Sequence, residues 1–490
     1  MGSEMELNQA IYVFLLTQIK FGVYPYESSL PTMEETGRQL HVSIDTVKPA
    51  YHRLQREGYI SLSKKAGAKV TAPYTQAQIE RHIQSFFALR KDALFDLCQS
   101  IWPLFGWAQW LGLKHASAET MDSVNQIADE TVKVPYGIWP YFEQLYGPLG
   151  NELLIRLTRY IYLFFQGPFY CVMKSRRGLT NALHHVQRIS ALCHQENWEA
   201  LPNVLLAIQE EYAGALRQFY QDAIPPQPAD EQMIFCWDAY KKSSQRRYTL
   251  SMDLLIDISR GVYPVGSYLP SAERLSLEKG VSISTVRRAV SLLNSIGAVK
   301  SSRPLGARVL PPAQSTENCD FTQPDLRRRL LDLTSSLQMF ALSCRSISKL
   351  TLASLTPASI RHWISHLCKI RSMGRYELVT YASLELLSKY APYQTIRTVY
   401  TELLRLLFWG NPLRGMRGVP DVTNAMYGPY FSCMIASLKE KQIDRFSAKL
   451  EELLLFELRV TVDQLLQVGI PEAGTILVPS KNEHWTYVSP

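Results

Sequence analysis

Residues 22–47 read GVYPYESSLPTMEETGRQLHVSIDTV, and residues 261–286 read GVYPVGSYLPSAERLSLEKGVSISTV. Both stretches lie inside a longer duplication, in which residues 11–70 align with residues 250–309 without a gap at a constant offset of 239. Identical residues occupy 23 of the 60 aligned positions. A repeat period near half of the chain length predicts a fused duplicate, in which one architecture occurs twice.

The repeated unit begins with a pattern typical of three helices. In the first copy, apolar residues recur at helical spacing from Ile11 to Ile19, and the GVYP stretch ends this helix. Thr32, with Glu35 three residues later, makes a capping box for a second helix. Ser43 is a suitable N-cap for a third helix.

A small β wing is predicted after the third helix. Gly58 suits the position that ends this helix, and residues 59–62 and 68–71 alternate like two strands of a hairpin. Pro49 lies inside the third helix and lacks a backbone donor, so the helix is expected to begin effectively near Asp45. Two helices joined by a short turn and followed by a wing form a winged helix-turn-helix.

Positive charge is concentrated in the two repeated heads. The chain carries a net charge of +8, and the two 60-residue copies contribute +3 and +4 of it. Concentration of charge on two small modules is typical of a protein with a polyanion partner. Two basic surfaces that are merely soluble are the alternative interpretation.

The composition excludes several other classes of protein. With 490 residues, 46% hydrophobic and 20% charged, the chain is expected to form three or four folded domains. Its eight cysteines show no C-x-x-C pair or metal-ligand spacing, which predicts reduced thiols and a cytoplasmic location. The N-terminus lacks a signal-peptide pattern. Residues 161–173, the most apolar segment, are too few to span a bilayer and predict a core helix.

Each head is followed by a long segment with Leu, Tyr, Ile and Phe at helical spacing, so we predict a mainly α protein. Winged helix-turn-helix domains are expected at residues 1–75 and 246–312, and all-α effector or association domains at residues 76–222 and 322–480. The proline-rich stretch within residues 223–245 predicts a linker. A full-length duplicate of this kind would imitate a dimer about a pseudo-twofold axis, and a further homodimer remains open.

The two heads resemble the GntR family of bacterial transcription regulators. The family pattern runs approximately G-x-x-x-x-G-x-x-L-P-S, V-S-R-x-T-V-R-x-A, L-x-x-x-G and G-x-G-x-x-V. The resemblance implies an operator-binding regulator whose helical domains sense a metabolite or mediate association. The matching residues are Gly22, Leu30, Pro31, Thr32, Val42, Ser43, Thr46, Val47, Lys48, Ala50, Leu54, Gly58, Gly67 and Val70 in the first copy, and Gly261, Gly266, Leu269, Pro270, Ser271, Val281, Ser282, Thr285, Val286, Arg287, Ala289, Leu293, Gly297, Gly306 and Val309 in the second.

Both heads depart from the family pattern at two places. Ile44 and Ile283 stand where the family has Arg after the V-S pair, and Glu34 and Glu273 stand where it commonly has Arg early in the second helix. Two usual base or phosphate contacts are therefore missing from each head. The alternative that follows is a structural or partner-binding protein whose heads no longer bind DNA.

The remaining polar residues still predict a DNA-binding surface. The start of the third helix enters the major groove in this motif, so Lys48 and Arg287 are candidates for base edges. Hydroxyls near the helix starts suit phosphate oxygens or act as N-caps, and the basic wings suit phosphates or the minor groove. The candidate DNA-binding residues are Thr32, Ser43, Asp45, Thr46, Lys48, Lys64, Lys65, Gly67 and Lys69 in the first head, and Ser271, Ser282, Ser284, Thr285, Arg287, Arg288, Arg303, Gly306 and Arg308 in the second.

Near the start of the third helix, the two heads differ at three positions. Asp45 aligns with Ser284, Lys48 with Arg287, and Pro49 with Arg288. One chain is therefore expected to recognise two unequal half-sites in double-stranded DNA, where a homodimer would require a palindrome.

The helical segments more weakly resemble the all-helical, ligand-sensing FCD domains of the same family, whose metal-binding members use one Asp and three His. Glu143 stands at the first expected His position and Trp139 at the Asp position. The resemblance implies an unidentified small-molecule effector, whereas these departures from the ligand set predict that no metal is bound, and no cofactor is expected. It shows no Gly-rich phosphate loop or nucleophile motif, so catalysis is not expected. The histidines that do not complete a ligand set are His184, His185, His194, His362 and His366.

Overall fold

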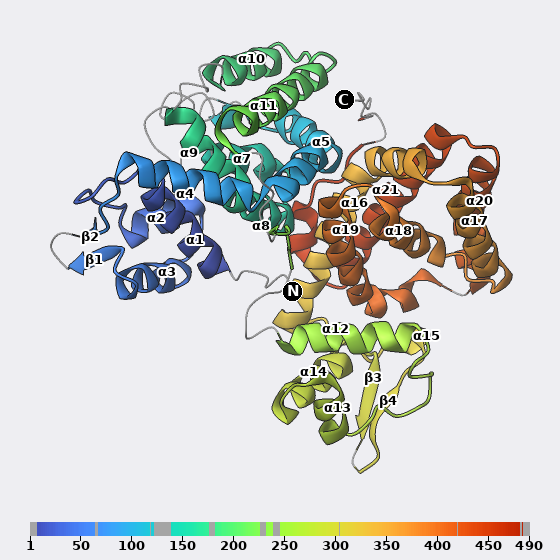
Figure 1. Ribbon diagram of the computed structural model, residues 1–490. Helices are drawn as coiled ribbons and strands as arrows, with labels where there is room; N and C mark the ends of the chain where they lie inside the picture. Colours follow the sequence, from blue (N-terminus) through green and yellow to red (C-terminus); the bar gives the residue numbers. More distant parts are fainter. Residues whose placement is uncertain are drawn as a thin grey trace. The chain divides into compact units, whose positions relative to one another are not determined.

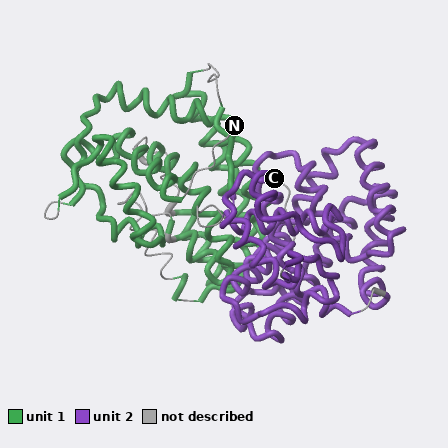
Figure 2. The backbone as a smooth tube through the Cα atoms, turned by 90° about the horizontal axis from the view of Figure 1, so that it is seen from below, with its two compact units in different colours: residues 1–237, 485–490 green, residues 238–484 purple. Residues whose placement is uncertain are grey.

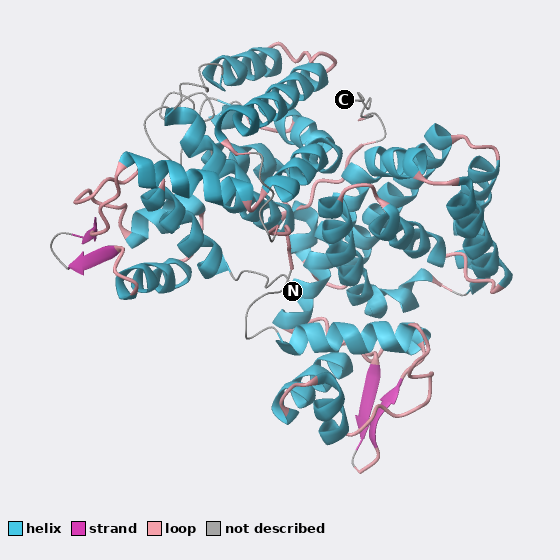
Figure 3. Cartoon of the chain, in the orientation of Figure 1, coloured by secondary structure: helices cyan, strands magenta, loops and turns pink. Residues whose placement is uncertain are grey.

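The computed structural model describes residues 7–63, 67–117, 119–121, 139–175, 182–225, 232–238, 246–302, 304–418, 420–480 and 483. The chain divides into two compact units, the first built on residues 1–237 and the second on residues 238–484 (Figure 2). In each unit a small head with a two-stranded wing precedes a body made of helices (Figures 1 and 3). The predicted mainly α fold with small β wings is confirmed.

The first head has the predicted order of elements. Its helices are α1 (Leu7–Lys20), α2 (Met33–Leu40) and α3 (Ile44–Arg56), and its wing pairs β1 (Ile60–Ser63) with β2 (Gly67–Val70). The three helices pack their apolar stripes against one another and against the inner face of the wing. The side chains at these contacts are buried. The core residues include Ile11, Phe14, Leu15, Leu40, Val47, Leu54, Ile60 and Val70.

The second head repeats every element at the same offset. It consists of α12 (Arg246–Ser259), α13 (Ala272–Lys279), α14 (Ile283–Ser295), β3 (Val299–Ser302) and β4 (Gly306–Val309). Each of these boundaries lies 239 residues after its counterpart in the first head. The wing registers also correspond, because Ile60 pairs with Val70 and Val299 with Val309. The duplication is therefore preserved in three dimensions.

Local hydrogen bonds explain why the second helices begin where they do. The hydroxyl of Thr32 accepts from the backbone N–H of Glu35 at 3.1 Å, and the Glu35 carboxylate accepts from the Thr32 N–H at 2.7 Å. This is the predicted capping box. In the second head, Ser271 accepts from the N–H of Arg274 at 3.2 Å. Helix α3 begins at Ile44 and continues through Pro49.

The body of the first unit is formed by helices only, within the described residues. The apolar segment 161–173 is buried in it, as the predicted core helix required, although a π-helical turn divides the segment. No described helix is long and apolar enough to cross a membrane. The elements are α4 (Gln76–Ala88), α5 (Lys91–Lys114), α7 (Trp139–Tyr146), η1 (Gly147–Leu149), α8 (Glu152–Ile161), η2 (Tyr162–Gln166), α9 (Gly167–Ser175), α10 (Ala182–His194) and α11 (Leu201–Ala223).

An extended segment follows this body, and we call residues 232–237 the strap. The N–H of Met233 donates to the carbonyl of Leu89 at 2.7 Å, which ties the strap to the end of α4. Phe235 is 2% exposed and lies edge-on against the rings of Tyr160 and Phe164. Part of the predicted linker is therefore packed against the first body.

The body of the second unit is also helical. Its longest helices, α16 and α21, pack along one another, and the buried rings of Trp363, Tyr400, Trp409 and Tyr427 fill its interior. Inside it, Glu457 accepts from Arg417 and from the Tyr427 hydroxyl, both at 2.7 Å. The elements are α15 (Pro312–Ser315), α16 (Pro324–Ser354), α17 (Pro357–Ser372), α18 (Leu378–Tyr390), α19 (Gln394–Leu406), η4 (Leu407–Arg417), α20 (Pro420–Lys439), α21 (Ile443–Gln467) and η5 (Pro471–Thr475).

Candidate nucleic-acid interface

The third helix of the first head has one buried and one exposed face. Val47 and Leu54 are fully buried in the head core. Asp45 and Lys48, both candidate contacts, are exposed on the opposite side. Helix α3 is therefore held by its apolar stripe and offers its polar residues to solvent, as a recognition helix requires.

Helix α14 shows the same division in the second head. Val286 and Leu293 are fully buried, whereas Ser284, Arg287 and Arg288 are exposed. The exposed face carries two arginines where α3 carries Lys48 and Pro49. Arginine can bind a guanine edge with two hydrogen bonds, whereas lysine offers a single point charge.

The hydroxyls at the starts of these helices have different partners. Ser43 occupies the N-cap position of α3, but its hydroxyl contacts the Thr46 hydroxyl at 2.9 Å and makes no cap hydrogen bond. Ser282 does cap α14, because it accepts from the N–H of Thr285 at 3.2 Å. The Ser282 hydroxyl also lies 2.9 Å from that of Ser284. The N-cap role predicted for both serines therefore holds in full only for Ser282.

The cations in the N-terminal halves of the recognition helices have weak partners or none. Lys48 and Arg288 make no hydrogen bond or ion pair with the described residues. Arg287 lies 3.9 Å from Glu273, and their side chains are 73% and 61% exposed. An ion pair so exposed contributes little, so all three cations are available to an anionic partner.

The wings present further basic residues. Lys69 and Arg308 are exposed on the outer faces of β2 and β4. Gly67 and Gly306 start these strands with φ of +68° and +101°, a conformation that accounts for glycine in the tight turn. The predicted wing residues Lys64, Lys65 and Arg303 lie outside the described residues.

Three exposed residues of this surface were absent from the candidates. Ile44 and Ile283 are 44% and 38% exposed at the starts of the recognition helices, although isoleucine usually lies in the core. Such a side chain can contact the methyl group of thymine in the major groove. Lys300, exposed on β3, has no basic counterpart in the first copy, where Ser61 stands, so comparison of the copies did not reveal it.

The structure does not assemble a metal site from the FCD-like positions. Glu143 lies 2.7 Å from Nε2 of His41, the residue that ends α2. Burial and the nearby Arg159 lower the pKa of His41, and burial raises the pKa of Glu143. His185 pairs with Glu211 at 2.7 Å. Within the described residues, no group of three or more His, Cys, Asp or Glu side chains could hold a metal ion.

Comparisons with known proteins place the two heads in one family. A family model described as bacterial regulatory proteins, gntR family, matches residues 7–70 and 249–309. No curated protein matches the chain.

Several solved structures are similar to parts of the chain. A GntR protein of Streptococcus agalactiae is 17% identical, with 44% of this chain and 99% of that one covered and a TM-score of 0.20. A putative transcriptional regulator GntR from Rhodococcus sp. RHA1 is 15% identical, with 44% and 98% covered and a TM-score of 0.24. A GntR-family regulator from Pseudomonas syringae pv. tomato is 17% identical, with 48% and 91% covered and a TM-score of 0.20. From the two matched segments, we conclude that the chain is a DNA-binding transcriptional regulator that carries the gntR-family winged-helix domain twice.

Proposed function

We propose that this regulator binds one operator through both heads and that the two heads read unequal half-sites. The observation that carries this proposal is the difference in exposed side chains between two recognition helices that begin and end at equivalent positions. Their exposed faces present Asp45 and Lys48 in α3, but Ser284, Arg287 and Arg288 in α14. The local net charge of the second face is therefore higher by two, so the two helices cannot prefer the same base pairs and phosphates equally.

The duplication supports the use of both heads on one operator. Single-headed DNA-binding proteins commonly pair to reach two half-sites, whereas this chain supplies two heads covalently. Linking two binding modules makes the second binding step intramolecular, which raises the overall affinity without any new contact. Such a protein would act in the cytoplasm and lie on the nucleoid when bound.

We further propose that the helical bodies make DNA binding responsive to a small molecule. In the first unit the head packs on its body through several contacts, among them the approach of His41 Nε2 to a carboxylate oxygen of Glu143 at 2.7 Å. Helices α1 and α9 also pack together there. A ligand that changed how the head packs on its body would change the position of α3. This change would couple the ligand site to the DNA-binding surface.

Footprinting on a selected operator tests the unequal half-sites. Selection from a random duplex library with the full chain is expected to return two different half-sites. Lys48→Ala should weaken protection of one half-site, and Arg287→Ala should weaken protection of the other. A symmetric operator, protected equally in both variants, would contradict the proposal. Heads that bind no duplex at any salt concentration would instead favour a structural or partner-binding role.

A further inference from the structure

Hydrogen bonds hold the strap, which follows the first body in the chain, on the surface of that body. Nε2 of Gln232 donates to the carbonyl of Ala88 at 3.0 Å, and Oε1 of the same glutamine accepts from the N–H of Asp92 at 3.3 Å. One residue later, Met233 donates to the carbonyl of Leu89 at 2.7 Å. The strap is therefore bonded to backbone atoms on both sides of the junction between α4 and α5.

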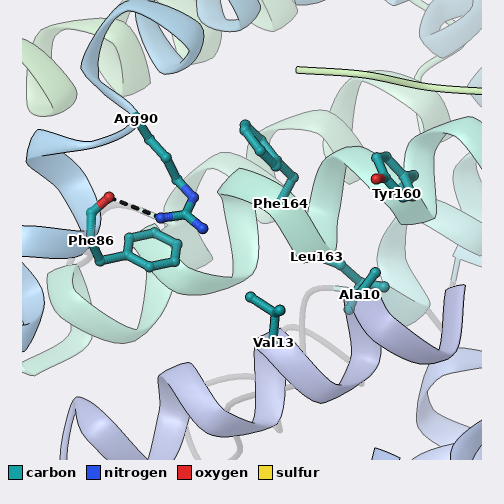
Figure 4. A pocket seen from close by; sticks show the side chains of 7 residues that line it. All are labelled: Ala10, Val13, Phe86, Arg90, Tyr160, Leu163 and Phe164. Atoms are coloured by element: carbon teal, nitrogen blue, oxygen red, sulfur yellow. Dashed lines mark hydrogen bonds between the residues drawn. The ribbon is translucent and has the colours of Figure 1, made fainter. Parts of the chain in front are cut away.

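Phe235 adds an apolar anchor to these hydrogen bonds. Tyr160 and Phe164, the two rings against it, follow one another along α8 and η2 (Figure 4). Their ring centroids lie 5.9 and 5.5 Å from that of Phe235, and both pairs have edge-to-face geometry, which is favourable for aromatic rings. The neighbouring Ile234 is 58% exposed. One face of the strap is therefore turned to the body and the other to solvent.

The second body holds the equivalent segment as well. Residues 471–476 lie 239 positions after the strap, and Ala473 and Ile476 are buried there. Directly after them, the carbonyl of Leu477 accepts from Nε2 of Gln338 in α16 at 2.7 Å. Packing of this segment on its body is therefore a property of the duplicated unit. In the first copy, however, the segment lies between a body and a further head.

The strap shortens the chain that connects the first body to the second head. Ten residues lie between Phe235 and Arg246, the first residue of α12, whereas 22 lie between Ala223, the last residue of α11, and Arg246. A fully extended chain spans at most about 3.3–3.6 Å per residue. The second head can therefore be reached over roughly 40 Å from Phe235, but over roughly 80 Å from Ala223.

We propose that Gln232, Met233 and Phe235 are positioning residues that limit the spacing between the two half-sites that one chain occupies. The proposal rests on the proposed function, because only a chain that binds one operator through both heads has a spacing to limit. One helical turn of DNA moves a half-site by about 34–36 Å. The strap therefore withholds about one turn of reach from the second head.

The strap also favours the second binding step at the native spacing. Once one head is bound, the effective concentration of the other falls approximately as the −3/2 power of the linker length. A linker of 22 residues in place of ten would lower this concentration about threefold. The same contacts thus give tighter binding at short spacing and exclude long spacing.

An operator series with no, one and two helical turns inserted between the half-sites tests the proposal by anisotropy. Whole turns keep both half-sites on the same side of the duplex. Phe235→Ser combined with Met233→Pro removes the apolar anchor and the backbone donor of the strap. We expect this variant to bind the native spacing about threefold more weakly than the parent chain and to retain two-headed binding at one turn more. Ile234→Ser alters only the exposed face of the strap and should bind as the parent chain does.

An insertion variant separates the spacing effect from the stability of the first body. About twelve Gly and Ser residues inserted between Ser243 and Ser244 leave the strap intact and restore the length that it withholds. This variant should reproduce the spacing profile of the strap variant and unfold at the temperature of the parent chain. Hydrogen exchange at the Met233 amide should stay slow in it and become fast in Phe235→Ser. An insertion variant with the parent's spacing profile would overturn the proposal, and so would an Ile234→Ser profile like that of the strap variant.

Failure of the strap's role is distinguishable from failure of the proposed function. A parent chain that binds a single half-site as tightly as the complete operator does not use both heads, and this result would overturn the proposed function and the strap's role together. A parent chain that requires both half-sites, but has the same spacing limit as the strap variant, would overturn the strap's role alone.

Discussion

Lys300 and Arg308 are directly paired residues of the second wing, and both are exposed on the same outer face of its hairpin. Like charges directly opposite one another destabilise an antiparallel pair. In the first wing, the corresponding pair is Ser61 and Lys69, which carries a single charge. The second wing therefore retains an unfavourable pair of cations, which a nucleic-acid phosphate backbone would neutralise.

The paired cations of the wing predict opposite effects on binding and on stability. Replacing both Lys300 and Arg308 with Ala should weaken binding to any duplex and lower the steepness of its salt dependence by about one unit for each lost phosphate contact. The free energy of unfolding should stay constant or rise by roughly a few tenths of a kcal/mol. Anisotropy over a salt series and thermal unfolding measure the two effects. Unchanged affinity would remove the second wing from the interface.

Arg287 is expected to carry sequence discrimination. If it reads a base, Arg287→Ala should lower specific binding by roughly 1–3 kcal/mol and relax the preference at one position of one half-site. Arg371→Ala removes an equally charged, exposed residue of α17 in the helical body and serves as the control. Equal losses in the two variants would show that only overall charge matters.

Ser43 and Ser282 allow the capping role to be separated from a role in binding. Ser282→Ala should lower the free energy of unfolding by about 1 kcal/mol, because it removes the cap hydrogen bond to Thr285. Ser43→Ala should lower it less, because Ser43 makes no cap hydrogen bond. Chemical denaturation measures both values. If Ser43 contacts a phosphate, its variant loses DNA affinity with little loss of stability, and the reverse result would assign it to capping alone.

Glu451 predicts a pH dependence in the stability of the second unit. Its carboxylate is 3.0 Å from Arg345, yet burial outweighs this attraction and raises the pKa of Glu451 to about 7. The folded state therefore holds the proton more tightly than the unfolded state. This contribution to stability is present at low pH and is lost as the pH rises through about 7.

Calorimetry at about pH 5.5 and about pH 8 should show the second unit less stable at the higher pH, with roughly 1–3 kcal/mol of the difference due to this group. Glu451→Gln should reduce the difference. Glu452→Gln alters an exposed neighbour and should leave the difference in place. A pH dependence equal in both variants would assign the effect to other groups.

The heads were predictable because their determinants are local. Capping residues such as Thr32, turn glycines such as Gly58 and the alternation of short strands each act over a few residues. Because the unit occurs twice, signals of this kind appear in both copies of the sequence. The wing registers followed from the same spacing, since alternation of buried and exposed residues fixes which residues face inward.

The features of the bodies depend on residues distant in sequence and were less accessible. Helical spacing predicted that the segments after the heads are α, but it does not state which helices meet. The position of the Arg90 guanidinium 5.8 Å from the ring centroid of Phe164, a residue of η2, is visible only once the body has folded. Likewise, the sequence did not reveal that Phe235 packs on Phe164, because Phe235 lies in a proline-rich stretch that predicts a linker.

The salt dependence of duplex binding by the full chain tests the central claim most directly. If both heads contact phosphates through their recognition helices and wings, the logarithm of the affinity should fall with the logarithm of the salt concentration with a slope of about −4 or steeper. Combining Lys48→Ala with Arg287→Ala should make the slope shallower by about two units. A flat response, or a slope that the double variant leaves unchanged, would contradict the account.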